Sequence, residues 1–201
     1  AGPYGDRFQA GKEGLSLRAL REVGGLVDLG PLKPRMPEVL KTPDRRIPLA
    51  HPYIVADMPR LRAALADAKR KDRLLLVGRR QVRNMNSWLH NAQVLAKGRT
   101  RCTLLMHPDD AKQFGLATGE KARVRSKSGE IVTEVEVSDE MMKGVVSLPH
   151  GFGHTRPGSR TQVATRLQPG ANANQLTDEG PLDVPSGTHI ANGIPVEVAR
   201  A

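Results

Sequence analysis

The sequence of 201 residues is poor in cysteine and in aromatic residues, with one Cys, one Trp, two Tyr and three Phe. The single Cys102 excludes an internal disulfide, and it excludes an iron–sulfur or structural zinc site built from cysteines of this chain alone. Because aromatic side chains are scarce, the core must consist mainly of Val, Leu, Ile and Ala. No apolar run approaches the roughly 18 residues of a membrane span. We therefore expect neither a membrane span nor a signal peptide, and a reducing, cytoplasmic location.

Familiar catalytic motifs are also missing from the sequence. There is no phosphate-binding loop ending in Gly-Lys-Ser/Thr, no G-x-G-x-x-G after a strand, no H-E-x-x-H and no nucleophile elbow. These absences argue against nucleotide hydrolysis and against an ordinary hydrolase. What the sequence has in excess is positive charge, because 31 Lys and Arg oppose 21 Asp and Glu, for a net charge of +10. Such a charge favours an anionic partner.

Proline and glycine predict an extended first part of the chain. Prolines follow one another too closely before residue 60 for a long regular element. Two short helices are expected there: one over 16–23, capped by Ser16 and ended by Gly24, and one that begins near Asp57. The remainder of residues 1–71 is predicted to be a strap that lies over a larger body.

From residue 72 the pattern changes to short strands with little helix, which predicts a small, mainly β barrel over 72–201. The strands expected are 74–77, a hairpin over 121–137 that turns at Ser128-Gly129, 145–148 and 194–198. A short helix is expected between 108 and 115, and one helical turn after Ser138.

The loop that follows the first predicted strand is dense in groups that bind anions and polar rings. Arg binds phosphate oxygens in a bidentate manner, and Asn both donates and accepts at the edge of a heterocycle. The loop therefore suits a polyanion that carries a polar heterocycle. The alternative is a solvated basic loop whose Trp88 packs into the core. The residues of this loop that would contact such a ligand are Gly78, Arg79, Arg80, Arg83, Asn84, Asn86, Ser87 and His90.

Two further polar loops have both a binding and a structural interpretation. His150 and His154, four residues apart, suggest a metal site, but the glycines between them oppose the helix that would align them. A turn that brings His150 and Gly151 to an anion, or a plain structural turn, is favoured instead. In 170–178 the Asn and Thr side chains either bind a ligand or cap the local backbone.

A series of segments resembles a known family when taken in order. The landmarks are LLVGRR (75–80), NSWLHN (86–91), HPDDA (107–111), Gly115-Leu116, Gly119-Glu120, GVVSLPHG (144–151), NQLTD (174–178) and Ser186-Gly187. Over about 72–199 the sequence resembles the C-terminal domain of molybdopterin-dependent oxidoreductases of the dimethyl-sulfoxide-reductase superfamily, which includes formate dehydrogenases and nitrate reductases. The segment 42–49 is similar to the lead-in of that domain.

The resemblance implies a six-stranded double-psi β-barrel that covers a molybdopterin guanine dinucleotide carrying molybdenum or tungsten. Cofactor contacts carried over by matching positions are Gly78, Arg79, Arg80, Arg83, Asn84, Asn86, Ser87, His90, His150, Gly151, Asn174 and Thr177. The family's metal ligand and iron–sulfur cysteines lie far upstream of this domain. The chain would therefore bind cofactor without catalysing alone, and its partner would be the remainder of the catalytic chain or a separate catalytic subunit.

Some positions depart from the family pattern. Lys143 and Val184 stand where many members have Pro, and Asn192 stands where a Lys often meets the pterin, so one cationic contact is expected to be missing.

A competing interpretation from the charge alone is a basic nucleic-acid-binding module, which the scarcity of aromatic stacking platforms disfavours. A small-molecule hydrolase has only isolated His and Asp residues in its favour.

Overall fold

The computed structural model describes residues 4–5, 14–67 and 73–201. The chain divides into two compact units, Ala1–Leu49 and Ala50–Ala201. The boundary predicted between residues 71 and 72 falls in 68–72, outside the described residues, and it stays a prediction.

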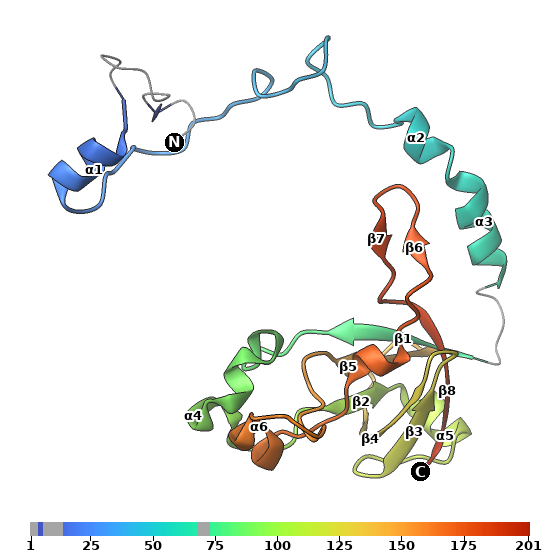
Figure 1. Ribbon diagram of the computed structural model, residues 1–201. Coiled ribbons are helices and arrows are strands. Elements are labelled where there is room, and N and C mark those ends of the chain that lie inside the picture. The colour runs from blue at the N-terminus through green and yellow to red at the C-terminus, as the bar shows by residue number, and fades with distance from the viewer. Residues whose placement is uncertain (1–3, 6–13, 68–72) are drawn as a thin grey trace. The chain divides into compact units, whose positions relative to one another are not determined.

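Six strands of the second unit form a closed barrel (Figure 1). Around the barrel the order is β1-β5-β2-β4-β3-β8. The pairs β1–β5 and β2–β4 are parallel, and the other four pairs are antiparallel. The six-stranded barrel with short helices is therefore confirmed. Its strands are β1 (Leu74–Arg79), β2 (Thr103–Met106), β3 (Lys121–Arg125), β4 (Glu130–Val137), β5 (Val145–Pro149) and β8 (Ile194–Arg200).

The strand order has an internal two-fold relation. Exchanging β1, β2 and β3 with β4, β5 and β8 leaves every neighbour unchanged, and each pair keeps its parallel or antiparallel sense. The barrel thus consists of two interlocked halves of three strands each, as the predicted double-psi topology requires.

The barrel interior is filled by aliphatic side chains that alternate with polar ones along the strands. In the predicted hairpin, Ala122 and Val124 of β3 face the core together with Ile131 and Val135 of β4. Strands that alternate in this way bury one face and leave the other to solvent. The hairpin is where the alternation predicts it, β1 and β8 each run two residues beyond their predicted ends, and β2 was not among the strands expected.

The predicted helices are confirmed as α1 (Leu17–Val23), α3 (Met58–Asp67) and α5 (Pro108–Gln113). Ser16 Oγ accepts from Ala19 N at 3.1 Å, and Gly24 ends α1 in the left-handed region. The helical turn expected after Ser138 is wrong, because residues 139–140 form a simple turn. Neither α2 (Pro52–Val55) nor the short β6 (Leu182–Asp183) and β7 (Thr188–His189) hairpin was predicted. No helix in the described part of the chain is long and apolar enough to cross a membrane.

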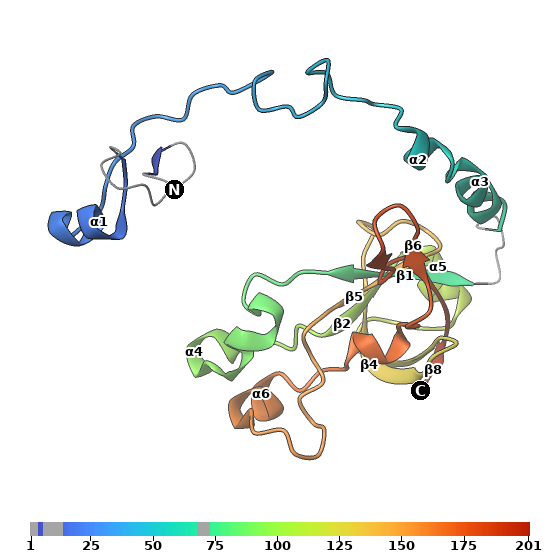
Figure 2. The same cartoon turned by 45° about the horizontal axis from the view of Figure 1, so that its top comes forward.

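Short helical segments pack beside the barrel, where α4 and α6 lie together (Figures 1 and 2). The first is η2 (Met85–Asn91), which follows β1, and α4 (Gln93–Ala96) comes directly after it. The other is α6 (Gln162–Leu167), which follows β5. These elements contact one another because β1 and β5 are parallel neighbours, so the chain leaves both strands at the same edge of the barrel.

The fully buried Leu104 of β2 tests the barrel core. Leu104→Ala should lower the free energy of unfolding by about 2–5 kcal/mol, because it removes apolar contacts and leaves a cavity. Val132→Ala, on the 47% exposed outer face of β4, should cost less than about 1 kcal/mol. Urea unfolding followed by circular dichroism measures both. Equal losses in the two variants would contradict this account of the core.

Candidate functional site

The carboxyl ends of β1 and β5 bring two of the predicted binding loops together. The parallel register pairs Gly78 with Leu148 and Arg79 with Pro149. Immediately after this pair, the His150 Nδ1 lies 3.1 Å from the Arg79 carbonyl oxygen. The loop 80–91 and the loop 150–154 are thereby placed side by side, although they are separated by about sixty residues of sequence.

The first loop contains a turn of unusual backbone conformation. Met85, Asn86 and Ser87 have φ values of 42°, 60° and 112°. Non-glycine residues rarely adopt positive φ, and such conformations cost of order 1–3 kcal/mol each. They persist only where surrounding contacts hold them, and they concentrate at functional sites. The sequence gives no sign of these positive φ values, because none of the three residues is a glycine.

Asn84 holds this turn in place through hydrogen bonds. Its side chain is buried, and Nδ2 donates to the His150 carbonyl oxygen at 3.1 Å. Its own carbonyl oxygen accepts from Ser87 N at 2.9 Å and from Leu89 N at 3.1 Å. Asn84 therefore links the two loops, and its predicted cofactor contact is joined by a structural role.

Gly151 makes the close approach of the two loops possible. A Cβ atom at this position would lie 2.9 Å from Asn86 C and 3.0 Å from Asn86 O. Gly151 also has a φ of 89°, which side chains disfavour. A glycine is needed here on both grounds.

Arg80, Asn86 and His150 form an exposed polar cluster over the turn. Asn86 Oδ1 accepts from an Arg80 guanidinium nitrogen at 3.0 Å and lies 2.8 Å from His150 Nε2. Both ring nitrogens of His150 thus face oxygen atoms, Nδ1 that of the Arg79 carbonyl and Nε2 that of the Asn86 side chain. The remaining guanidinium donors of the exposed Arg80 face solvent, where an anion can reach them.

Arg79 differs from its neighbour, because its guanidinium turns toward the barrel. It donates to the Ser147 carbonyl oxygen and to both the carbonyl oxygen (2.7 Å) and Oγ1 (2.9 Å) of Thr103. Burial lowers the pKa of Arg79, and the carboxylate of Glu136 opposes that effect. Arg79 therefore links β1, β5 and β2, and these bonds occupy donors that the predicted cofactor contact would need.

His90 and His154 form a second link between the loops. His90 is almost fully buried, its Nδ1 lies 2.8 Å from His154 Nε2, and its ring stands 4.3 Å from that of Phe152. Burial, followed by repulsion from His154 and Arg101, lowers the pKa of His90 to about 4. Burial also lowers the pKa of His154. One neutral ring therefore donates to the other.

This pair also bears on the hypothesis of a metal site at His150 and His154. His154 faces His90, whereas His150 faces Asn86 and the Arg79 carbonyl. Across residues 14–67 and 73–201, no three side chains of His, Cys, Asp or Glu gather as metal ligands would.

The third predicted loop forms η3 (Ala173–Leu176). Asn172 caps this segment by accepting from Asn174 N at 3.0 Å, and Thr177 Oγ1 donates to the Asn174 carbonyl at 2.9 Å. The side chain of Thr177 is thus engaged in local capping, the structural alternative considered for this loop. A Cβ on Gly153 would lie 2.6 Å from Asn172 Cβ, so the start of η3 touches the loop 150–154.

Two polar residues outside the set predicted to contact the cofactor help to build the site. Asn192 Oδ1 accepts from Gly78 N at 2.7 Å. Asn192 therefore satisfies a backbone donor at the position where the family resemblance predicts that a cationic contact is missing. Asn172 joins η3 to the loop 150–154, as described above. Only its place two residues before the predicted Asn174 could have signalled this.

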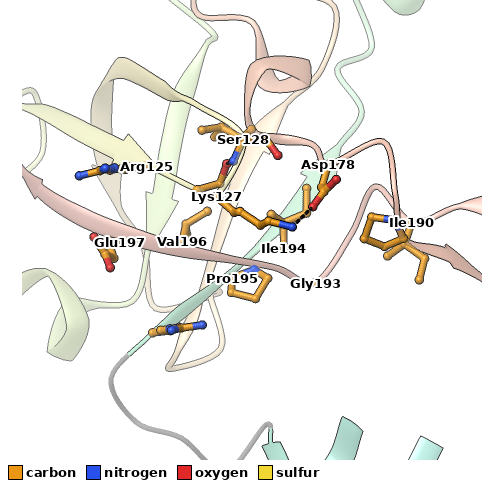
Figure 3. A pocket seen from close by; sticks show the side chains of 14 residues that line it. Arg125, Lys127, Ser128, Asp178, Ile190, Gly193, Ile194, Pro195, Val196 and Glu197 are labelled. Carbon is orange, nitrogen blue, oxygen red and sulfur yellow. Dashed lines mark hydrogen bonds and ion pairs between the residues drawn. The ribbon is translucent and has the colours of Figure 1, made fainter. Parts of the chain in front are cut away.

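A cavity of about 600 Å³ lies elsewhere on the barrel, between β8, the β3–β4 turn and the segment after η3 (Figure 3). Figure 3 shows Lys127 pointing toward Asp178, and the two are ion-paired at 3.1 Å. Arg125 is the cross-strand neighbour of Glu197. None of the residues predicted to contact the cofactor lines this cavity, and carboxylates balance most of its positive charge.

Comparison with known proteins identifies the family. Residues 74–195, more than half of the chain, match the family model described as "Molydopterin dinucleotide binding domain". The chain belongs to this family. The match covers β1, both linked loops and the start of β8, so the site described above lies within the molydopterin-binding domain.

Individual relatives are larger proteins. The chain is 25% identical over 111 residues to a tetrathionate reductase subunit of Salmonella typhimurium, covering 47% of the chain and 11% of that protein. It is 44% identical over 61 residues to dimethyl sulfoxide/trimethylamine N-oxide reductase of Rhodobacter capsulatus, covering 30% of the chain and 7% of that protein. Acetylene hydratase from Pelobacter acetylenicus shares the fold, with a TM-score of 0.54 at 21% identity over 73% of this chain and 20% of its own. The molydopterin-binding domain thus spans a small part of these relatives.

Gly144 and Gly151, which flank β5, both have positive φ, but only at Gly151 would a side chain meet a neighbouring backbone. Substituting each by Ala therefore distinguishes the effect of the clash on stability from the effect of positive φ. Gly151→Ala should lower the free energy of unfolding by about 2–4 kcal/mol, because the new Cβ would clash with the Asn86 backbone. Gly144→Ala is the matched control, since its φ is 83° and a Cβ there meets nothing within 4 Å; it should cost about 1 kcal/mol. Thermal unfolding compares them, and equal destabilisation would show that the contact with Asn86 is unimportant.

The histidine pair should make the domain sensitive to acid. The pKa of His90 is lowered in the folded state, so between pH 6.5 and about 4 the unfolded state binds more protons. The stability is therefore present above pH 6.5 and falls as the pH is lowered toward 4. Urea unfolding across this range should show the loss, and His90→Gln/His154→Gln should reduce it. His189→Gln, at an exposed ring, should retain the full dependence; a double variant as acid-sensitive as the parent would refute the assignment.

Proposed function

We propose that this chain binds a molybdopterin guanine dinucleotide carrying molybdenum or tungsten, as the C-terminal part of a larger oxidoreductase. The observation that supports this most directly is the strained turn 85–87, held against Gly151 inside the region that matches the family. Strain of this kind in an exposed loop is typical of a ligand site.

The residues of the two loops fit the chemistry of such a cofactor. Arg80 and Arg83 are exposed cations that would bind phosphate oxygens. Asn86 and His150 carry donors and acceptors that would meet the edge of a pterin or guanine ring. Gly78, Ser87 and Gly151 would present backbone atoms to the cofactor. Asn174 is exposed, two residues after the Asn172 that touches Gly153. When bound, the group would supply the redox chemistry of its metal.

The remaining predicted contacts have partners within the protein. Arg79, Asn84 and His90 hold the loops in place through the bonds described above, and Thr177 bonds to Asn174. We propose that these residues position the contact residues, whatever direct contact they add. Arg83 lies apart from the polar cluster, in the lining of a cavity of about 300 Å³.

The rest of the enzyme would supply the metal ligand, the substrate pocket and any iron–sulfur cluster. The relatives support an oxidoreductase, since they include a tetrathionate reductase, a dimethyl sulfoxide reductase and an F420-dependent formate dehydrogenase of Methanocaldococcus jannaschii. We propose a formate-dehydrogenase-like or nitrate-reductase-like enzyme of the cytoplasm. In that enzyme this chain would bind and orient the cofactor and exclude water from it.

Binding of GDP, which carries the guanine and diphosphate of the cofactor, tests the proposal. Hydrogen exchange of the 201-residue chain should show protection of 78–91 and 150–154 when GDP is added. Arg80→Gln should weaken GDP binding by roughly tenfold, because it removes a charge-assisted hydrogen-bond donor. Arg123→Gln is the matched control, because Arg123 is exposed on β3 and pairs with Glu130.

Absence of protection by GDP together with failure of the chain to copurify with a larger catalytic chain would overturn the proposal. A single-stranded oligonucleotide serves as the competing ligand in the same assay. If it protected these loops more strongly than GDP and lost affinity steeply with salt, the nucleic-acid interpretation would replace the cofactor interpretation.

A further inference from the structure

The histidine pair is a titratable link at the edge of the barrel where the loops 80–91 and 150–154 meet, here called the binding edge. His90 belongs to η2, and His154 follows β5. Their ring centroids are 5.0 Å apart, with the ring planes at 86°. The bond between the rings needs one nitrogen that carries a hydrogen and one that does not. When both rings are protonated, both nitrogens carry a hydrogen, so the bond is lost and two cations face each other.

The surroundings of the pair disfavour positive charge. The ring beside His90 is that of Phe152, which is uncharged. Burial lowers the pKa of both histidines, and His154 and Arg101 lower that of His90 further. Only the backbone of Gly151 favours the protonated rings, and none of the groups that shift either pKa within residues 73–201 is a carboxylate. A buried imidazolium without a counter-ion is costly, so protonation favours a state in which the rings reach water.

The elements that flank the pair are held by side chains that do not titrate. Asn91 Oδ1 accepts from Val163 N at 3.0 Å and from Ala164 N at 3.4 Å, which joins η2 to α6. Gln168 is almost fully buried, and its Nε2 donates to the carbonyl oxygen of Ala96 at 3.0 Å, which joins the end of α6 to α4. These amide bonds do not depend on pH. Acid therefore acts on the link between the two loops and leaves α4 and α6 in place.

We propose that His90 and His154 form an acid-sensitive latch that opens the binding edge while the barrel stays folded. The core cluster of the barrel contains no His, Asp or Glu, so acid has no such group to protonate there. Opening separates the turn 85–87 from Gly151, whose close contact with Asn86 requires that the loops lie together. One further step rests on the proposed function: the closed edge retains the cofactor, and the open edge admits or releases it.

Hydrogen exchange of the 201-residue chain without ligand, at pH 7 and at pH 5, tests the latch. After correction for the intrinsic exchange rate, amides of 84–91 and 150–154 should lose protection by at least about tenfold. The reason is that His90 in the open state, with its ordinary pKa of 6.5, binds protons that the closed pair excludes until about pH 4. Amides of the hairpin 121–137 should keep their protection.

Two variants distinguish the pair from other groups. His90→Gln/His154→Gln retains a donor and an acceptor in each side chain but does not titrate, so the protection of its loops should not depend on pH. His189→Gln is the matched control, since that ring is exposed and bonds to the Asp178 carbonyl, and it should keep the full response. If the double variant does not fold, His154→Gln replaces it; without the second cation, its loops should respond less than those of the parent.

Three results would overturn the latch. The first is loss of protection in 121–137 together with the loops, since the whole domain would then unfold. The second is loop protection that is constant between pH 7 and pH 5. The third is a folded variant of the pair that responds as strongly as the parent.

Titration with GDP at pH 7 and pH 5 tests the further step separately. A fall in GDP affinity at pH 5 that is larger in the parent than in the double variant supports retention and release by the latch, and an equal fall overturns that step. If GDP binds at neither pH, the proposed function fails, whereas a latch shown by exchange without ligand stands.

Discussion

The parallel pairing of β1 with β5 is the constraint on which the site depends. Antiparallel neighbours would send the two chains to opposite ends of the barrel, whereas parallel neighbours end at one edge. Gly78 and Arg79 therefore leave β1 where Leu148 and Pro149 leave β5. Every link between the two loops follows from that register. These links are the contact of His150 with Arg79, the bond from Asn84 to His150 and the pairing of His90 with His154.

The same edge of the barrel gathers several features that raise the free energy of the folded state. All three residues of the turn 85–87 have positive φ, the His90 ring is buried without charge, and the charges of Arg83 and Arg101 repel each other. Each feature opposes folding when taken alone. The closed barrel offsets them, because most residues of its core belong to the strands and not to these loops. A rigid scaffold that carries strained loops is a common arrangement for binding sites.

Prediction from sequence succeeded where a single element carries its own signal. The alternation of Ala122, Val124 and Ile131 identified the hairpin, and Ser16 with Gly24 delimited α1. It did not foresee η2, α4 or α6, which are short and whose stability comes from packing against one another. Nor did it foresee that Lys97 and Arg99 line one cavity together with Arg83. Nothing in the sequence around Lys97 and Arg99 sets them apart, and only the folded chain brings them opposite Arg83.

The sequence by itself indicated a small β barrel and the loops in which polar groups gather, since these follow from periodicity and composition, and the resemblance carried by its ordered motifs implied the six-stranded form. Only the tertiary structure decided which arginine faces solvent and which faces the barrel. Arg79 and Arg80 are adjacent in sequence, but Arg79 is the last residue of β1 and bonds to Ser147 and Thr103, whereas Arg80 follows the strand and bonds to Asn86. The end of β1, fixed by its pairing with the distant β5, thus separates a cation that links strands from one that is exposed to solvent.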